Sequence, residues 1–60
     1  MVNAWFYDYK EGHFHHIVKT TPKFVYYDVV DDNIVIVRRK KPLAVARRAI
    51  RVGDWIRVRR

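Results

Sequence analysis

The chain has 60 residues, half of them apolar, no cysteine, and a formal net charge of +7 at pH 7. This length allows a single domain over residues 1–60, and the lack of cysteine excludes disulfides and a Cys-ligated zinc site. No apolar run approaches the roughly 20 residues of a membrane span and no signal peptide is recognisable, so we expect a cytoplasmic protein whose small core depends on packing.

Two strands and a hairpin are predicted at the start of the chain. Residues 2–9 combine Val with Trp, Phe and Tyr, which favour strands. Residues 10–12, Lys-Glu-Gly, read as a turn in which Gly12 supplies a positive φ. Residues 13–20 form the returning strand, which ends before Pro22 because proline has no amide proton to donate to a sheet.

Two more strands are predicted in the middle of the chain. Residues 23–30 are rich in aromatic and β-branched residues, and residues 31–33, Asp-Asp-Asn, read as a turn because Asp and Asn tolerate left-handed φ. Residues 34–39 form the next strand. Its first four residues, Ile-Val-Ile-Val, are apolar on both faces, which predicts a central strand that is covered on both sides or curled into a barrel.

Residues 42–52 fit a short helix better than a strand. As a helix, the segment gathers its apolar residues on one stripe, Pro42 suits the first position, and Gly53 suits the residue after the last turn. As a strand, one face would mix apolar and charged side chains. We therefore predict the helix, followed by a last strand over residues 54–59 with Trp55 and two arginines on one face.

Residues 50–58, with the sequence IRVGDWIRV, resemble the Val-x-x-Gly-Asp-x-Val motif common in SH3-like barrels, including the KOW type of ribosomal and transcription proteins. A small basic β-protein without cysteine is also similar to the lysine-rich chromatin proteins of hyperthermophilic archaea, and dense charge without Ser or Gln is a thermophile tendency. Neither resemblance carries over a site residue. The expected fold is mainly β: a small five-stranded SH3-like barrel or bent antiparallel sheet with one short helical segment near 42–52.

The positive charge is confined to one end of the chain. Residues 38–60 hold ten Lys or Arg and one acid, a net charge of +9, whereas residues 1–37 hold three Lys and five acids, a net charge of −2. A charge gathered in one region has a polyanion as its natural complement, and Arg binds phosphate in bidentate fashion and stacks on bases. The bland alternative is a solvated basic surface. The residues expected to hold phosphates are Arg38, Arg39, Lys40, Lys41, Arg47, Arg48, Arg51, Arg57 and Arg59.

Nine aromatic rings are more than one face of a 60-residue sheet can bury. Some are therefore expected to be exposed and to stack on bases, at about 1–3 kcal/mol each, although for any single ring core packing is the rival interpretation. Trp55 lies within the basic region; it stands on the outer face if its neighbours Ile56 and Val58 face the core, and otherwise it is core itself. The candidates for stacking are Trp5, Tyr7, Tyr26 and Trp55.

Three histidines are the one feature that hints at an enzyme. His13 and His15 share a strand face, and such a pair could chelate zinc or copper, or act as general acid and base in RNA cleavage. No third ligand stands at a recognisable spacing, and no Ser or Cys nucleophile is present. We therefore expect surface histidines on a hairpin, no metal site, no cofactor and no catalysis.

The function expected is that of a non-enzymatic nucleic-acid-binding protein, for DNA or RNA, associated with the nucleoid or the ribosome. The basic end would hold phosphates and the exposed aromatics would contact bases. One alternative is a protein-interaction barrel that docks an acidic partner, and a third is a small ribonuclease or toxin. No membrane partner is expected, and a homodimer remains open.

Overall fold

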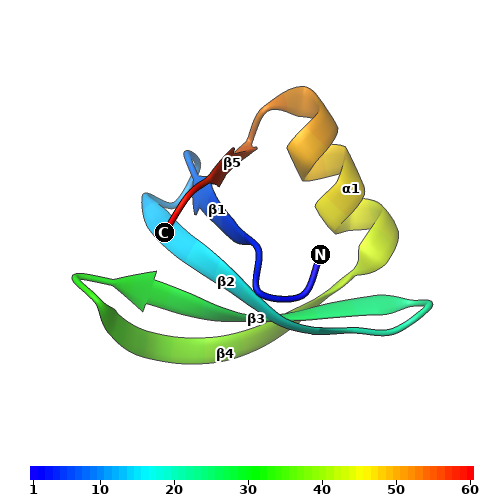
Figure 1. Ribbon diagram of the computed structural model, residues 1–60. Helices are drawn as coiled ribbons and strands as arrows, with labels where there is room; N and C mark the ends of the chain where they lie inside the picture. The colour runs from blue at the N-terminus through cyan, green and yellow to red at the C-terminus, as the bar shows by residue number, and fades with distance from the viewer.

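A computed structural model describes residues 1–60 as one five-stranded sheet and one helix (Figure 1). All strand pairs are antiparallel, and the order across the sheet is β4-β3-β2-β1-β5. The predicted mainly β fold and its single helix are confirmed, and the sheet is bent and open rather than a closed barrel. The elements are β1 (Trp5–Asp8), β2 (His13–Thr20), β3 (Phe24–Asp31), β4 (Ile34–Pro42), α1 (Leu43–Val52) and β5 (Trp55–Val58).

The strand boundaries differ from the predicted ones where single residues change the backbone direction. The first strand begins at Trp5 instead of Val2 because Asn3 has a φ of 66°, and Ala4 donates its N–H to the carbonyl of Met1 in a turn. The fourth strand continues past Arg39 to Pro42, which starts the helix. No helix in the structure has the length and apolar character needed to cross a membrane.

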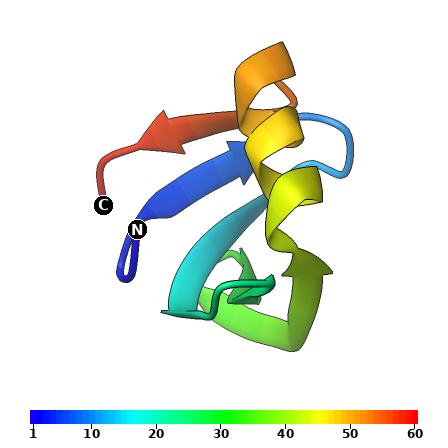
Figure 2. The same cartoon turned by 90° about the vertical axis from the view of Figure 1, so that its right-hand side faces the viewer.

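The helix lies on one face of the bent sheet, which we call the inner face; the opposite face is the outer face. Figures 1 and 2 show α1 in the open side of the bend, where it packs on β3, β4 and β5. Gly53 ends α1 with a φ of 88°, and the N–H groups of Gly53 and Asp54 bond to the carbonyls of Ile50 and Ala49, as in a Schellman motif. The core between α1 and the sheet consists of Ala4, Phe6, Ile17, Val25, Tyr27, Val29, Ala46 and Trp55.

The fourth strand was predicted to be central, and this prediction is wrong, because β4 is an edge strand. Its apolar start is exposed, with relative accessibilities from 66% at Ile34 to 39% at Val37. Strand β4 makes most of its contacts with β3 and few with α1. Figure 1 shows the turn between β3 and β4 on the side away from α1. A continuous apolar run allows both faces of a strand to be buried, but it does not ensure that another part of the chain covers them. Here no other part of the chain covers this run.

Strand β5 turns Trp55 toward the core and not toward solvent. Trp55 pairs with Asp8 and Arg57 pairs with Phe6, so these β5 side chains point to the inner face. Trp55 is 2% exposed, whereas Ile56 is 41% exposed. The outer placement of Trp55 is therefore wrong, and its core alternative holds, since strand alternation allows both solutions and the register with β1 selects one.

Candidate nucleic-acid interface

A row of aromatic rings crosses the outer face from β1 to β2. Trp5 and Tyr7 lie opposite His16 and Phe14 in the antiparallel register, and directly opposed side chains are the closest cross-strand neighbours. Trp5 stacks on His16 with ring centroids 4.4 Å apart and planes 18° apart. Tyr7 meets Phe14 edge-on at 5.0 Å and Tyr9 edge-on at 4.8 Å. We call Trp5, Tyr7, Tyr9, Phe14 and His16 the aromatic row.

Arg60 lies over this row from the end of β5. Its guanidinium carbon is 4.5 Å from the ring centroid of Trp5 and 4.5 Å from that of Phe14. The same guanidinium donates a hydrogen bond to Asn33 Oδ1 in the turn between β3 and β4. The C-terminal residue therefore carries a positive charge across the rings, in the geometry of a cation–π contact.

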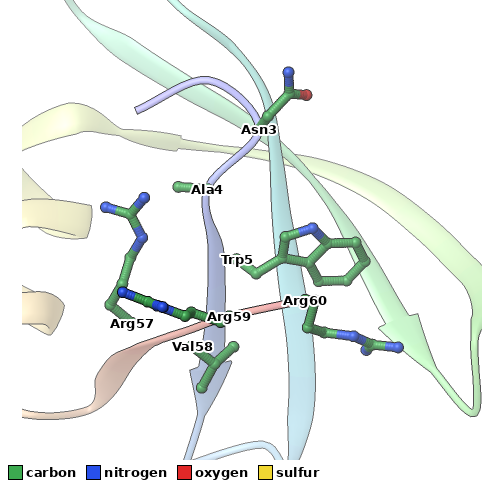
Figure 3. A pocket seen from close by; sticks show the side chains of 7 residues that line it. All are labelled: Asn3, Ala4, Trp5, Arg57, Val58, Arg59 and Arg60. Carbon is green, nitrogen blue, oxygen red and sulfur yellow. The ribbon is translucent and has the colours of Figure 1, made fainter.

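A hollow of about 600 Å³ opens beside Trp5, between β1 and the end of β5 (Figure 3). Figure 3 shows Arg60 on the Trp5 side of β1, and Arg57 and Arg59 on the other side. No acidic side chain lines the hollow, and none of the three arginines forms an ion pair. Their positive charge is therefore available to an anion. The lining residues are Asn3, Ala4, Trp5, Arg57, Val58, Arg59 and Arg60.

Two of the predicted phosphate-binding arginines on β4 are engaged by carboxylates. Arg38 Nε lies 2.7 Å from Asp28 Oδ1, and Arg38 Nη2 lies 3.3 Å from Asp28 Oδ2, a bidentate pair on the outer face. This hydrogen bonding lowers the pKa of Asp28 and raises that of Arg38. Arg39 Nη1 lies 3.6 Å from Glu11 Oε2. Arg38 and Arg39 must release the carboxylates of Asp28 and Glu11 before they bind phosphate.

Lys40, Lys41 and Tyr26 form cation–π contacts within the fold. Lys40 Nζ is 4.8 Å from the ring centroid of Phe24, and Lys41 Nζ is 5.5 Å from that of Trp55. Tyr26 is half-buried on the outer face of β3, with Lys19 Nζ 5.6 Å from its ring. Tyr26 on β3 and Lys40 on β4 are opposite each other in the register, and β2 separates β3 from Trp5 and Tyr7 on β1.

The arginines of α1 are exposed but belong to another surface. Arg47, Arg48 and Arg51 lie on the helix, which covers the inner face, whereas the aromatic row lies on the outer face. The predicted basic residues therefore form three groups, on the β4 edge, on α1 and on β5, rather than one stripe. Phe14, His16 and Arg60 were not predicted as members of the outer site, because the pairing of β1 with β2 brings Phe14 and His16 to Trp5 and the pairing of β1 with β5 brings Arg60 there.

His15 is not a surface histidine as predicted. It lies on the inner face of β2, 1% exposed, with ring centroids 4.5 Å from Tyr27 and 4.6 Å from Trp55. Burial lowers its pKa to about 4 and so keeps the ring neutral, against the smaller opposing effect of Asp8. Neither ring nitrogen has a hydrogen-bond partner. Burial also raises the pKa of Tyr27.

The histidine, Asp8 and Glu11 form a cluster near the first hairpin. One potential ligand atom from each side chain lies within 4.8 Å of the others. These three residues could hold a metal ion, and the set could not be recognised in the sequence because Asp8 and His15 are seven positions apart on different strands. Comparisons with protein-family models, with curated proteins and with solved structures find no match to this chain.

Proposed function

We propose that the protein is a non-enzymatic nucleic-acid-binding module that binds at the end of β5 and on the adjoining outer face of the sheet. The observation that carries this proposal is the hollow beside Trp5: Arg60 lies on its aromatic-row side, Arg57 and Arg59 lie on the other side of β1, and none of the three forms an ion pair. Guanidinium groups bind phosphates in bidentate fashion, and half-buried rings on a sheet offer stacking surfaces for bases. Charge and rings together are the two parts that single-strand binding requires.

The preferred ligand is single-stranded DNA or RNA. Bases stack on a ring only when their faces are accessible, and in a duplex they are stacked on each other. The arginines supply the sequence-independent part of the affinity, which depends on salt because bound phosphates release counterions. Base contacts then come from Tyr9, which is exposed at the end of the row, and from Trp5 once Arg60 leaves its ring to bind a phosphate.

The test compares two double variants that lose equal charge from different surfaces. Arg57→Ala with Arg59→Ala removes charge from the hollow, and Arg47→Ala with Arg48→Ala removes it from α1. Binding to single-stranded DNA, duplex DNA and RNA is measured at two salt concentrations, with a thermal melt of each variant. We expect the hollow variant to bind single strands more weakly, with a salt slope shallower by about 0.7 per lost contact, and the α1 variant to change less.

Two outcomes would contradict the proposal. A greater loss in the α1 variant would move the interface to the helix. Equal binding of an acidic polypeptide such as polyglutamate, without quenching of tryptophan fluorescence by oligonucleotides, would favour the alternative of an acidic protein partner. Labelled RNA that remains intact during the titration is expected for a protein without ribonuclease activity.

A further inference from the structure

The first hairpin holds a carboxylate in a fixed position that faces a buried histidine. Asp8 ends β1, and its Oδ1 accepts hydrogen bonds from the N–H of Lys10 at 2.8 Å and the N–H of Glu11 at 3.2 Å. These bonds orient the carboxylate so that its second oxygen, Oδ2, lies 3.7 Å from His15 Nε2. The side chain of Asp8 is 7% exposed and that of His15 is 2% exposed.

This pair is unusual because Asp8 gives His15 no hydrogen bond. A distance of 3.7 Å is longer than the roughly 2.7–3.2 Å of a hydrogen bond, and both nitrogens of His15 lack a partner. Buried polar groups without partners are rare in folded proteins, and each one calls for an explanation. Two ligands of one tetrahedral ion, at bonds of about 2.0–2.2 Å, are separated by about 3.3–3.6 Å, which is close to the spacing found here.

A third ligand stands at the same place. Glu11 follows in the turn of the hairpin, and one of its carboxylate oxygens lies within 4.8 Å of the ligand atoms of Asp8 and His15. Its side chain is 51% exposed, and Asp8 and Glu11 both line an open hollow of about 370 Å³ beside α1. An ion that enters this hollow meets Glu11 and Asp8 first, and His15 Nε2 lies 3.7 Å beyond Asp8 Oδ2.

We propose that Asp8, Glu11 and His15 form a binding site for a divalent transition-metal ion, with Zn²⁺ as the best fit. One imidazole nitrogen and two carboxylate oxygens are ligands that zinc accepts, whereas Ca²⁺ and Mg²⁺ prefer sites made of oxygen alone. Three protein ligands leave the fourth position of a tetrahedral ion for water. The two carboxylates balance the charge of the ion, so the occupied cluster is neutral despite the basic chain.

Four cations lie around the site, Arg39, Lys41, Lys10 and Arg48, and two of them, Arg39 and Lys10, are paired with carboxylates. Arg39 Nη1 lies 3.6 Å from Glu11 Oε2, but both side chains are about half exposed, and such surface pairs are worth little. Lys41 is close enough to act on His15, and its ammonium group lies over the Trp55 ring. Lys10, in the same turn, pairs with Asp54. A bound ion would tie the hairpin to β2 and stabilise a core that has no disulfide, since it binds only the folded chain.

The experiment titrates Zn²⁺ into protein that has been freed of metal with a chelator, by calorimetry and by thermal melts. Glu11→Gln removes an exposed ligand without touching the core, and Asp8→Asn keeps an oxygen for the hairpin N–H groups. Asp31→Asn is the matched control, because it loses the same charge from an exposed position at the end of β3. We expect one Zn²⁺ per chain, a higher melting temperature with Zn²⁺, and affinity at least about tenfold weaker in each ligand variant than in the control.

A second readout locates the ion. His15 lies against Trp55, so Cu²⁺ at the site should quench the fluorescence of Trp55 in a Trp5→Phe background, and Glu11→Gln should weaken that quenching. Zn²⁺ affinity that is unchanged in both ligand variants, or reduced equally in Asp31→Asn, would overturn the proposal. So would a melting temperature that does not respond to millimolar Zn²⁺. The metal site shares no residue with the hollow beside Trp5, so loss of metal binding leaves the test of nucleic-acid binding independent.

Discussion

The guanidinium carbon of Arg60 lies 4.5 Å from the ring centroid of Trp5, although the two residues stand at opposite ends of the chain. The contact depends on the pairing of β5 with β1, in which Val58 is opposite Trp5, so Arg60 follows two residues beyond that pair. A tryptophan ring stacked on His16 thus has a cation above it and an arginine-lined hollow beside it. The geometry joins a stacking surface to a source of positive charge.

Replacing Arg60 by Ala should weaken binding to single-stranded nucleic acid without harming the fold. We expect a salt slope shallower by about 0.7, because one phosphate contact is removed, and a loss of about 0.5–1 kcal/mol of folding stability from the cation–π contacts with Trp5 and Phe14, which leaves the chain folded. Arg51→Ala is the control, since Arg51 is an exposed arginine on α1. Fluorescence titrations at several salt concentrations measure the slope and a thermal melt measures the stability; an Arg60 variant that behaves like the Arg51 variant would refute the role of this contact.

Trp55→Ala should destabilise the protein by about 3–5 kcal/mol, because a ring that is 2% exposed and packed on Phe6, Tyr27 and His15 leaves a cavity. A domain of 60 residues has little stability to spare, so the variant should be partly or fully unfolded at room temperature. A thermal melt without ligand checks this. Trp55→Phe keeps most of the packing and should remain folded, and a Trp55→Ala melt that matches the wild type would contradict the core position.

The ion pair of Asp28 with Arg38 should make stability depend on acid pH. The pKa of Asp28 is lowered by the guanidinium hydrogen bond, so the pair stabilises the fold above the ordinary carboxyl value of 3.8, and this contribution is lost as the pH falls through the lower folded value. Asp28→Asn should therefore be less stable than the wild type at pH 7, and the difference should shrink below about pH 4. Urea denaturation at pH 7, 4 and 2 measures it, with Asp31→Asn as the control for an acid without an ion pair. A difference that does not change with pH would contradict the assignment.

Ile34→Lys should change the free energy of unfolding by less than about 0.5 kcal/mol, because Ile34 is 66% exposed on an edge strand. Ile17, which is fully buried on β2, is the contrast: even the loss of one methyl group in Ile17→Val should cost about 0.5–1.5 kcal/mol. Chemical denaturation of both variants gives the comparison. If the lysine variant is the less stable of the two, the start of β4 is covered in solution.

Local chemistry made most of the elements predictable from the sequence. Gly12 has a φ of 76°, and Asp32 and Asn33 have φ values of 54° and 61°, so the β1–β2 and β3–β4 hairpins turn where the residue types allow left-handed backbone. Gly53 ends α1 in the same conformation, at 88°. Turn and cap preferences act within a few residues, so they depend on the adjacent sequence and on little else.

The aromatic and basic content of the candidate site was also evident from the sequence, but its assembly was not. Sequence alternation placed Trp5 and Tyr7 on one face, which holds in the structure. It offered no means to bring Phe14 and His16 beside them or to separate the arginines of α1 from those of β5.

What only the tertiary structure decided is which face of each strand is buried. Alternation along β5 permits either Trp55 or Ile56 to face the core, and the register with β1 chose Trp55. The apolar start of β4 predicted a central strand, and the order of the sheet makes it an exposed edge. His15 was assigned to the surface and lies in the core. A shift of one residue in strand pairing exchanges the two faces, and that pairing is set by hydrogen bonds between segments distant in the chain, which residue types alone do not encode.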